Sequence, residues 1–231
     1  TQYILLNVLE APILAFILAY LIRYIVDPLN KHYIFRQNEN IPPYIFMGII
    51  VALFFGLIIS AEEIFKDAKI LKREAFLNLS RSSYLASKIV ILFSISAIQM
   101  ALFVLVGNYV IGFKGMTFEF WLMLFSVMAF SNILGLIISA SFNSIITIYI
   151  LIPLLIIPQM VLGGAMFTFD KLNKDFTSVD KVPFVAELMP SRWAYEGLMV
   201  NQFKNNNYKK DRFDLELKQS KADYMQSLYK D

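Results

Sequence analysis

The sequence predicts an all-α integral membrane protein with five transmembrane helices. Hydrophobic residues make up 58% of the chain and charged residues only 17%, whereas soluble domains contain about 25% charged residues. Long apolar runs recur along the chain, and one strongly charged helical segment lies between the second and the third. These observations exclude an ordinary soluble domain and predict a multi-pass helical bundle. The net charge of +3 is small and gives no reason to expect a nucleic-acid partner.

The first two predicted membrane helices cover residues 3–26 and 44–60. At about 1.5 Å per residue, the first is long enough to cross a hydrocarbon core of about 30 Å. It contains Glu10, and a carboxylate in the bilayer is costly unless it is paired, neutral or close to the headgroups. We expect an interfacial or packing role for Glu10, with a place in a substrate pathway as the alternative. A polar loop is predicted at residues 27–43, and Pro42 and Pro43 at its end fit the start of the second helix.

The charged segment covers residues 60–88. Ser60 and Glu63 match a capping box, so we expect a helix to begin at Ser60. Its apolar positions recur at helical spacing: Ile64, Phe65, Ala68, Leu71, Ala75, Phe76 and Leu79. The many Lys and Arg residues place the segment in the cytoplasm by the positive-inside rule. It is either an interfacial anchor or, over residues 61–79, a coupling helix that contacts a soluble partner.

The third, fourth and fifth predicted membrane helices cover residues 84–112, 118–142 and 143–166. In the fourth, small residues repeat at every fourth position, at Ser131, Gly135 and Ser139, which predicts close packing against another helix. Gln99 and Asn132 lie deep in their helices. We expect them to form interhelical hydrogen bonds, with a role in a polar pathway as the alternative. Pro153 and Pro158 predict a kink or local unwinding in the fifth helix.

Residues 167–231 form the second predicted region, outside the bundle of residues 1–166. A short apolar piece at 182–189 and an amphipathic one at 191–203 are both too short to span a bilayer. Counting crossings from the cytoplasmic segment places this region on the external side, as a loop with short helices.

Two motifs link these segments to a known family. The first is ILKRE, at Ile70, Leu71, Lys72, Arg73 and Glu74, followed by YLASK at 84–88. The second is LGG at 162–164, followed by LMPSRWAYEGL at 188–198 and NQF at 201–203. In this order and placement they resemble the membrane domain of G-subfamily (type V) ABC exporters, in a bacterial homologue.

The resemblance implies a permease domain in the inner membrane that moves a hydrophobic or amphipathic substrate by alternating access. It implies that residues 70–74 couple the domain to a fused or separate nucleotide-binding domain, which holds ATP and Mg²⁺. It further implies a second copy of the membrane domain, short helices of the external loop that dip back toward the membrane, and an external gate at Ala165 and Met166. For Met166, packing under the segment of Trp193 is the alternative. The family also has a sixth membrane helix. The polar character of residues 204–231 departs from it, so we expect a truncation before that helix or an enlarged external domain.

Catalytic motifs are absent from the sequence. It contains no phosphate-binding loop, no cysteine and a single histidine, so we expect no catalytic residue, metal site or cofactor in this chain and assign ATP hydrolysis to the associated domain. Two other functions remain as alternatives. A non-ATP secondary transporter or channel requires paired ionisable residues near the bilayer midplane, and only Glu10 and Arg23 lie in an apolar run. A membrane scaffold component requires the bundle alone.

Overall fold

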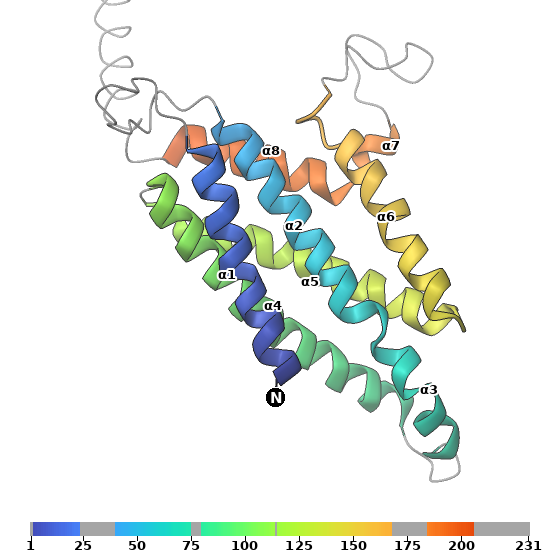
Figure 1. The fold of residues 1–231 in the computed structure, drawn as a ribbon. Helices are drawn as coiled ribbons and strands as arrows, with labels where there is room; N and C mark the ends of the chain where they lie inside the picture. The colour runs from blue at the N-terminus through green and yellow to red at the C-terminus, as the bar shows by residue number, and fades with distance from the viewer. Residues whose placement is uncertain (1, 24–39, 75–79, 114, 168–183, 206–231) are drawn as a thin grey trace, which may run out of the picture.

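The structure is a computed structural model that describes residues 2–23, 40–74, 80–113, 115–167 and 184–205. Throughout these ranges the regular secondary structure is α-helical (Figure 1), which confirms the predicted all-α class. The helices are α1 (Gln2–Ile22), α2 (Ile41–Ala61), α3 (Glu63–Glu74), α4 (Arg81–Ile111), α5 (Thr117–Ser141), α6 (Ile145–Val161), α7 (Phe184–Glu187) and α8 (Pro190–Asn205). The loop predicted at residues 27–43 lies mostly outside the described residues.

Within the described residues, three stretches of helix are long and apolar enough to cross a membrane: Ile41–Arg73, which joins α2 and α3, and then α4 and α5. Two further apolar helices are shorter, over Asn7–Ile22 in α1 and over α6. The predicted extent of the fifth membrane helix was too long, because α6 ends at Val161. Gly163 and Gly164 follow, and glycine is a poor helix former. α6 stays helical through Pro153 and Pro158, so the predicted local unwinding is wrong, whereas the kink stays a prediction.

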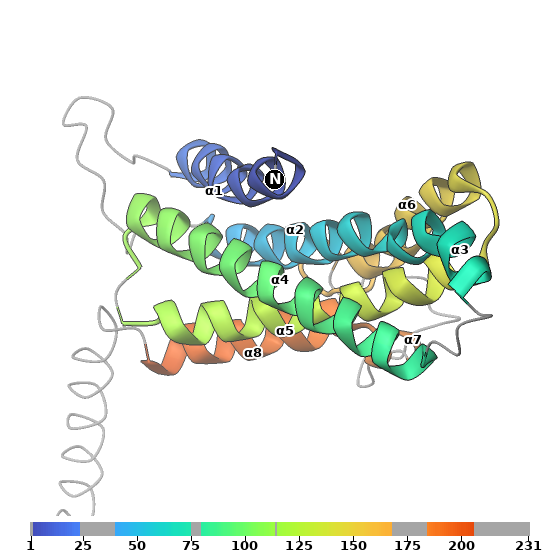
Figure 2. The same ribbon diagram turned by 90° about the horizontal axis from the view of Figure 1, so that it is seen from below.

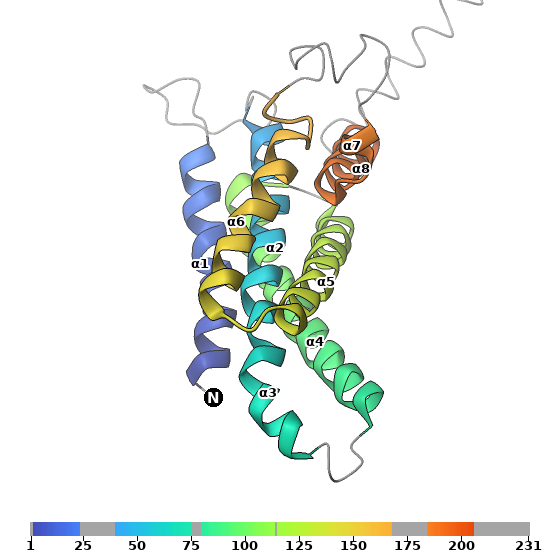
Figure 3. The same cartoon turned by 90° about the vertical axis from the view of Figure 1, so that its right-hand side faces the viewer.

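The helices form a bundle with α3 at one end and α7 and α8 at the other (Figures 1 and 3). α8 lies across the end at which α2 begins and packs against α2 and α5. α1 lies at the edge of the bundle, mainly against α4 (Figure 2). The charged helix and the two short helices after α6 are therefore at opposite ends, as the predicted topology requires.

Among the described helices, α2 and α5 form the most extensive contact, and their backbones approach closely. A Cβ atom at Gly56 would lie 2.6 Å from the Ser131 Cβ, and one at Gly135 would lie 1.9 Å from the Ser60 Oγ. Neither glycine leaves room for a larger side chain. The Ser131 hydroxyl also donates a hydrogen bond to the Leu53 carbonyl of α2. The predicted packing role of the small residues on this stripe is thus confirmed, and we call the contact the α2–α5 seam.

Replacing Gly56 by Ala tests the seam. The new methyl group would lie 2.7 Å from the Met128 carbonyl oxygen, so backbone must shift, and we expect the free energy of unfolding to fall by about 1–3 kcal/mol. Gly48→Ala is the matched control on the same helix, because its nearest atom belongs to the Phe103 ring at 3.4 Å. Unfolding in detergent micelles measures both variants. Equal stability of the two would contradict the close approach at Gly56.

Candidate functional site

The start of α3 is fixed by a side chain from α5. The backbone amides of Ile64 and Phe65 donate hydrogen bonds of 3.0 and 2.9 Å to the Ser139 Oγ. These amides are among the first four of the helix, which have no partner within it. The predicted capping box is wrong: Ser60 lies inside α2, fully buried, and its hydroxyl donates to the Gly56 carbonyl at 2.6 Å. Because α2 continues through Ser60, this residue does not stand at the start of a new helix and does not cap one.

Ion pairs connect α3 to α4. The Lys88 Nζ lies 2.7 Å from a carboxylate oxygen of Glu63 and 2.9 Å from one of Asp67. The Tyr84 hydroxyl donates to the same Asp67 oxygen at 2.8 Å. Glu63 and Asp67 are four residues apart on α3, as are Tyr84 and Lys88 on α4, so each pair shares one helix face. This four-residue spacing on both segments is the sequence signal for the contact, and it is absent from the predictions above.

Two carboxyls at the start of the charged segment, those of Asp67 and Glu62, are stabilised in their charged forms. Burial opposes ionisation of Asp67, but the hydrogen bonds from Lys88 and Tyr84 outweigh it and lower the pKa of this carboxyl. Glu62, between α2 and α3, accepts a hydrogen bond from the Tyr149 hydroxyl of α6 and pairs with Lys66. Burial again opposes the charge, and these contacts lower the pKa of Glu62. The beginning of α3 is thus bound to α4, α5 and α6.

The predicted coupling residues lie at the other end of α3. The side chain of Ile70 is 53% exposed, and those of Lys72 and Arg73 are also exposed. Leu71 is half-buried and lines a cavity between α3 and α4. Glu74 ends the helix, and its side chain lies outside the described part of the chain. The site therefore combines an anchored first half with an exposed basic second half.

The predicted pathway residues lie far from α3 in the sequence and have contacts typical of helix packing. The Gln99 Nε2 donates to the Asn7 carbonyl of α1 at 2.7 Å, and the Asn132 Nδ2 donates to the Ser96 Oγ of α4 at the same distance. Both amides are buried. Glu10 is exposed on α1. The structure does not bring these three side chains into the site at α3, and their place in a pathway stays a prediction.

The predicted gate residues follow α6, at the end of the bundle opposite α3. Ala165 packs against the hydrophobic core, and the side chain of Met166 is 52% exposed. Trp193 of α8 is also exposed, and its indole N–H donates to the Glu187 carbonyl at 2.7 Å. No cluster of three His, Cys, Asp or Glu side chains suited to a metal ion occurs in the described ranges. The arrangement is suited to mechanical coupling between helices, and α3 is its candidate functional element.

Comparison with known proteins agrees with this arrangement. The sequence model of one family, described as ABC-2 type transporter, matches residues 1–203 of the chain. No curated protein matches the chain at a significant level. The matched segment contains α1 to α7 in full and all of α8 except its last two residues.

A double-mutant cycle tests the ion pair between α3 and α4. Lys88→Gln and Asp67→Asn should each lower the free energy of unfolding, and the two should couple by about 0.5–1 kcal/mol because both partners are only partly exposed. Lys69→Gln in place of Lys88→Gln is the control, since Lys69 is two residues from Asp67 and does not face it. Unfolding in micelles gives the four stabilities of each cycle. No coupling, or equal coupling in the control, would contradict the contact.

Proposed function

The chain belongs to the ABC-2 type transporter family as its membrane domain, and we propose that it serves an ATP-driven exporter of the G-subfamily type in a bacterial inner membrane. Membrane domains of this family work with nucleotide-binding domains, and the chain is a multi-pass membrane protein. Because the chain belongs to an ABC transporter family, the two alternative functions, a non-ATP secondary transporter and a membrane scaffold component, are not proposed. The proposed substrate is hydrophobic or amphipathic, and ATP and Mg²⁺ bind the nucleotide-binding domain, fused or separate.

One observation supports α3 as the element that receives the motion. Its first turns contact α5 and α4 through Ser139 and Lys88. Glu62, directly before α3, accepts a hydrogen bond from Tyr149 of α6. The last turns of α3 present exposed basic and apolar side chains. In the proposal, α3 lies on the cytoplasmic side and contacts the nucleotide-binding domain through residues 70–74. When ATP closes that domain, α3 moves, and the attached helices change between inward-open and outward-open packings.

The proposal includes a second copy of the membrane domain with the substrate cavity on the two-fold axis. α2 supports this arrangement. It is the most buried of the long apolar helices, yet Met47 and Phe54 are 39% and 43% exposed. Both project from a helix that lies between α1 and α6 (Figure 1). In a dimer these two side chains would form part of an apolar cavity wall, which suits a hydrophobic substrate.

The double variant Arg73→Ala with Glu74→Ala tests coupling. We expect ATP hydrolysis to persist and substrate transport to fall at least tenfold. The melting temperature should stay within a few degrees, because Arg73 is exposed and exposed side chains contribute little to stability. Lys69→Ala is the control, as it removes an exposed charge of α3 outside residues 70–74. Transport and ATPase rates in proteoliposomes measure the effect. Unchanged transport in the double variant would reject α3 as the coupling helix.

Met166 is the proposed external gate, together with the smaller Ala165. The flexible thioether of Met166 can close against its symmetry mate and separate again easily. Because Met166 is 52% exposed, Met166→Ala should cost little stability while it raises basal ATPase activity and substrate leak. Met128→Ala, at a fully buried methionine of α5, should instead lower the free energy of unfolding by about 2–5 kcal/mol. If Met166→Ala neither leaks substrate nor raises basal ATPase activity, Met166 is not the gate.

A further inference from the structure

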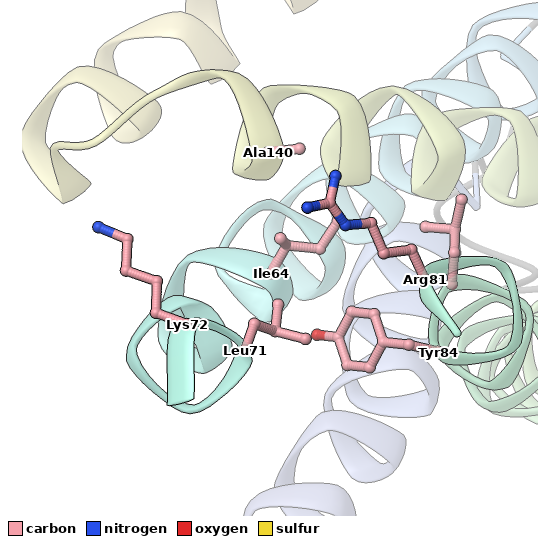
Figure 4. A pocket seen from close by; sticks show the side chains of 7 residues that line it. Ile64, Leu71, Lys72, Arg81, Tyr84 and Ala140 are labelled. Atoms are coloured by element: carbon pink, nitrogen blue, oxygen red, sulfur yellow. The ribbon is translucent and has the colours of Figure 1, made fainter. Parts of the chain in front are cut away.

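A cavity of about 450 Å³ opens between α3, the start of α4 and the end of α5. Its walls are mainly apolar, with Ile64 and Leu71 from α3, the Tyr84 ring and Leu85 from α4, and Ala140 from α5 (Figure 4). The volume is within the range of about 300–1,000 Å³ that is usual for small-molecule sites. The cavity can therefore hold part of an apolar chain.

Two basic side chains stand at the cavity. Arg81 extends over it toward Ala140, and Lys72 stands on the opposite wall (Figure 4). Both are exposed, and neither forms an ion pair with any residue that the structure describes. By contrast, the nearby carboxylates of Glu63 and Asp67 are both bound by Lys88. The described surroundings of the cavity thus leave an excess of positive charge at its edge, which is complementary to an anion.

The position of the cavity along the bundle identifies the source of that anion. α3 begins directly after the long apolar helix α2, so the cavity lies where the chain changes from apolar to charged, as is typical of a membrane surface. One to two turns further along α4, Val90 and Ile91 are 64% and 55% exposed, as expected for lipid-facing residues. Leu85, at 41% exposure, extends this apolar surface into the cavity. An apolar path with a basic edge at the membrane boundary fits an anionic amphiphile from the adjoining leaflet.

We propose that this cavity binds an anionic phospholipid. The Arg81 guanidinium contacts the headgroup phosphate, because its planar fork matches phosphate oxygens, and Lys72 adds a second charge from α3. The first carbons of an acyl chain lie against Leu71 and Leu85. The inference goes beyond the transport function and needs neither ATP nor substrate. Of residues 70–74 it uses Leu71 and Lys72, which line the cavity, and it leaves Ile70, Arg73 and Glu74 for the nucleotide-binding domain. It concerns a lipid that bridges the coupling helix and α4.

Lipid selectivity tests the proposal in the full transporter reconstituted in phosphatidylcholine nanodiscs. Spin-labelled phosphatidylglycerol and spin-labelled phosphatidylcholine are the probes, and the immobilised fraction of each is measured. We expect a preference for phosphatidylglycerol that falls about fivefold for each charge removed in Lys72→Gln and Arg81→Gln. Lys69→Gln with Arg73→Gln is the control, since it removes two charges from α3 away from the cavity. Equal immobilisation of the two lipids, or an equal loss in the control, would overturn the proposal.

A cavity-filling variant separates binding in the cavity from general attraction to the membrane. Ala140→Phe leaves both charges in place, and Ala140 is exposed, so the melting temperature should stay unchanged. We expect the phosphatidylglycerol preference to disappear. A preference retained in this variant would place the lipid elsewhere and overturn the proposal.

Cross-linking distinguishes a lipid from a protein segment as the occupant. Leu85→benzoylphenylalanine in the full transporter places a photoreactive group at the cavity, and mass spectrometry identifies the adduct. An adduct with the mass of phosphatidylglycerol supports the proposal. An adduct with a peptide of the nucleotide-binding domain would show that the partner protein fills the cavity and would overturn it.

Discussion

The close approach of α2 and α5 is the constraint on which the rest of the bundle depends. Between helices in lipid the hydrophobic effect contributes little, so association relies on close van der Waals contact and interhelical hydrogen bonds. The α2–α5 seam supplies both, because Gly56 and Gly135 let the backbones meet and Ser131 donates to the Leu53 carbonyl. α2 becomes the central helix as a result, and α6 and α8 pack around it.

The seam also determines where the charged helix starts. Ser139 continues the small-residue stripe of α5 by one turn. There its hydroxyl accepts hydrogen bonds from the backbone amides of Ile64 and Phe65, in the first turn of α3. Lys88 and Tyr149 add contacts from α4 and α6. A displacement of α3 therefore acts on three bundle helices through polar contacts with defined directions. Such contacts can switch between discrete arrangements, which is the property that a transmission element requires.

Sequence patterns predicted the helices and their order well, because apolar length and helical spacing are local properties of the chain. The same local view failed at Ser60. A Ser followed by Glu three residues later matches a helix start, but the same pattern also occurs inside helices. Here the hydrogen bonds to Ser139 of α5 fix where α3 begins. Ser139 and Lys88 were missed as contacts because their partners are 75 and 25 residues away in the chain. The end of α6 was misplaced because apolar residues continue past the last helical turn.

The seam and the cap of α3 are parts of one continuous helix, and this limits how the length of the chain can vary. A single residue inserted in α5 between Ser131 and Ser139 would rotate all that follows by about 100° and advance it by about 1.5 Å. Ser139 would leave the face that meets α3, even though every original side chain remained. Deletions would have the same effect in the opposite sense.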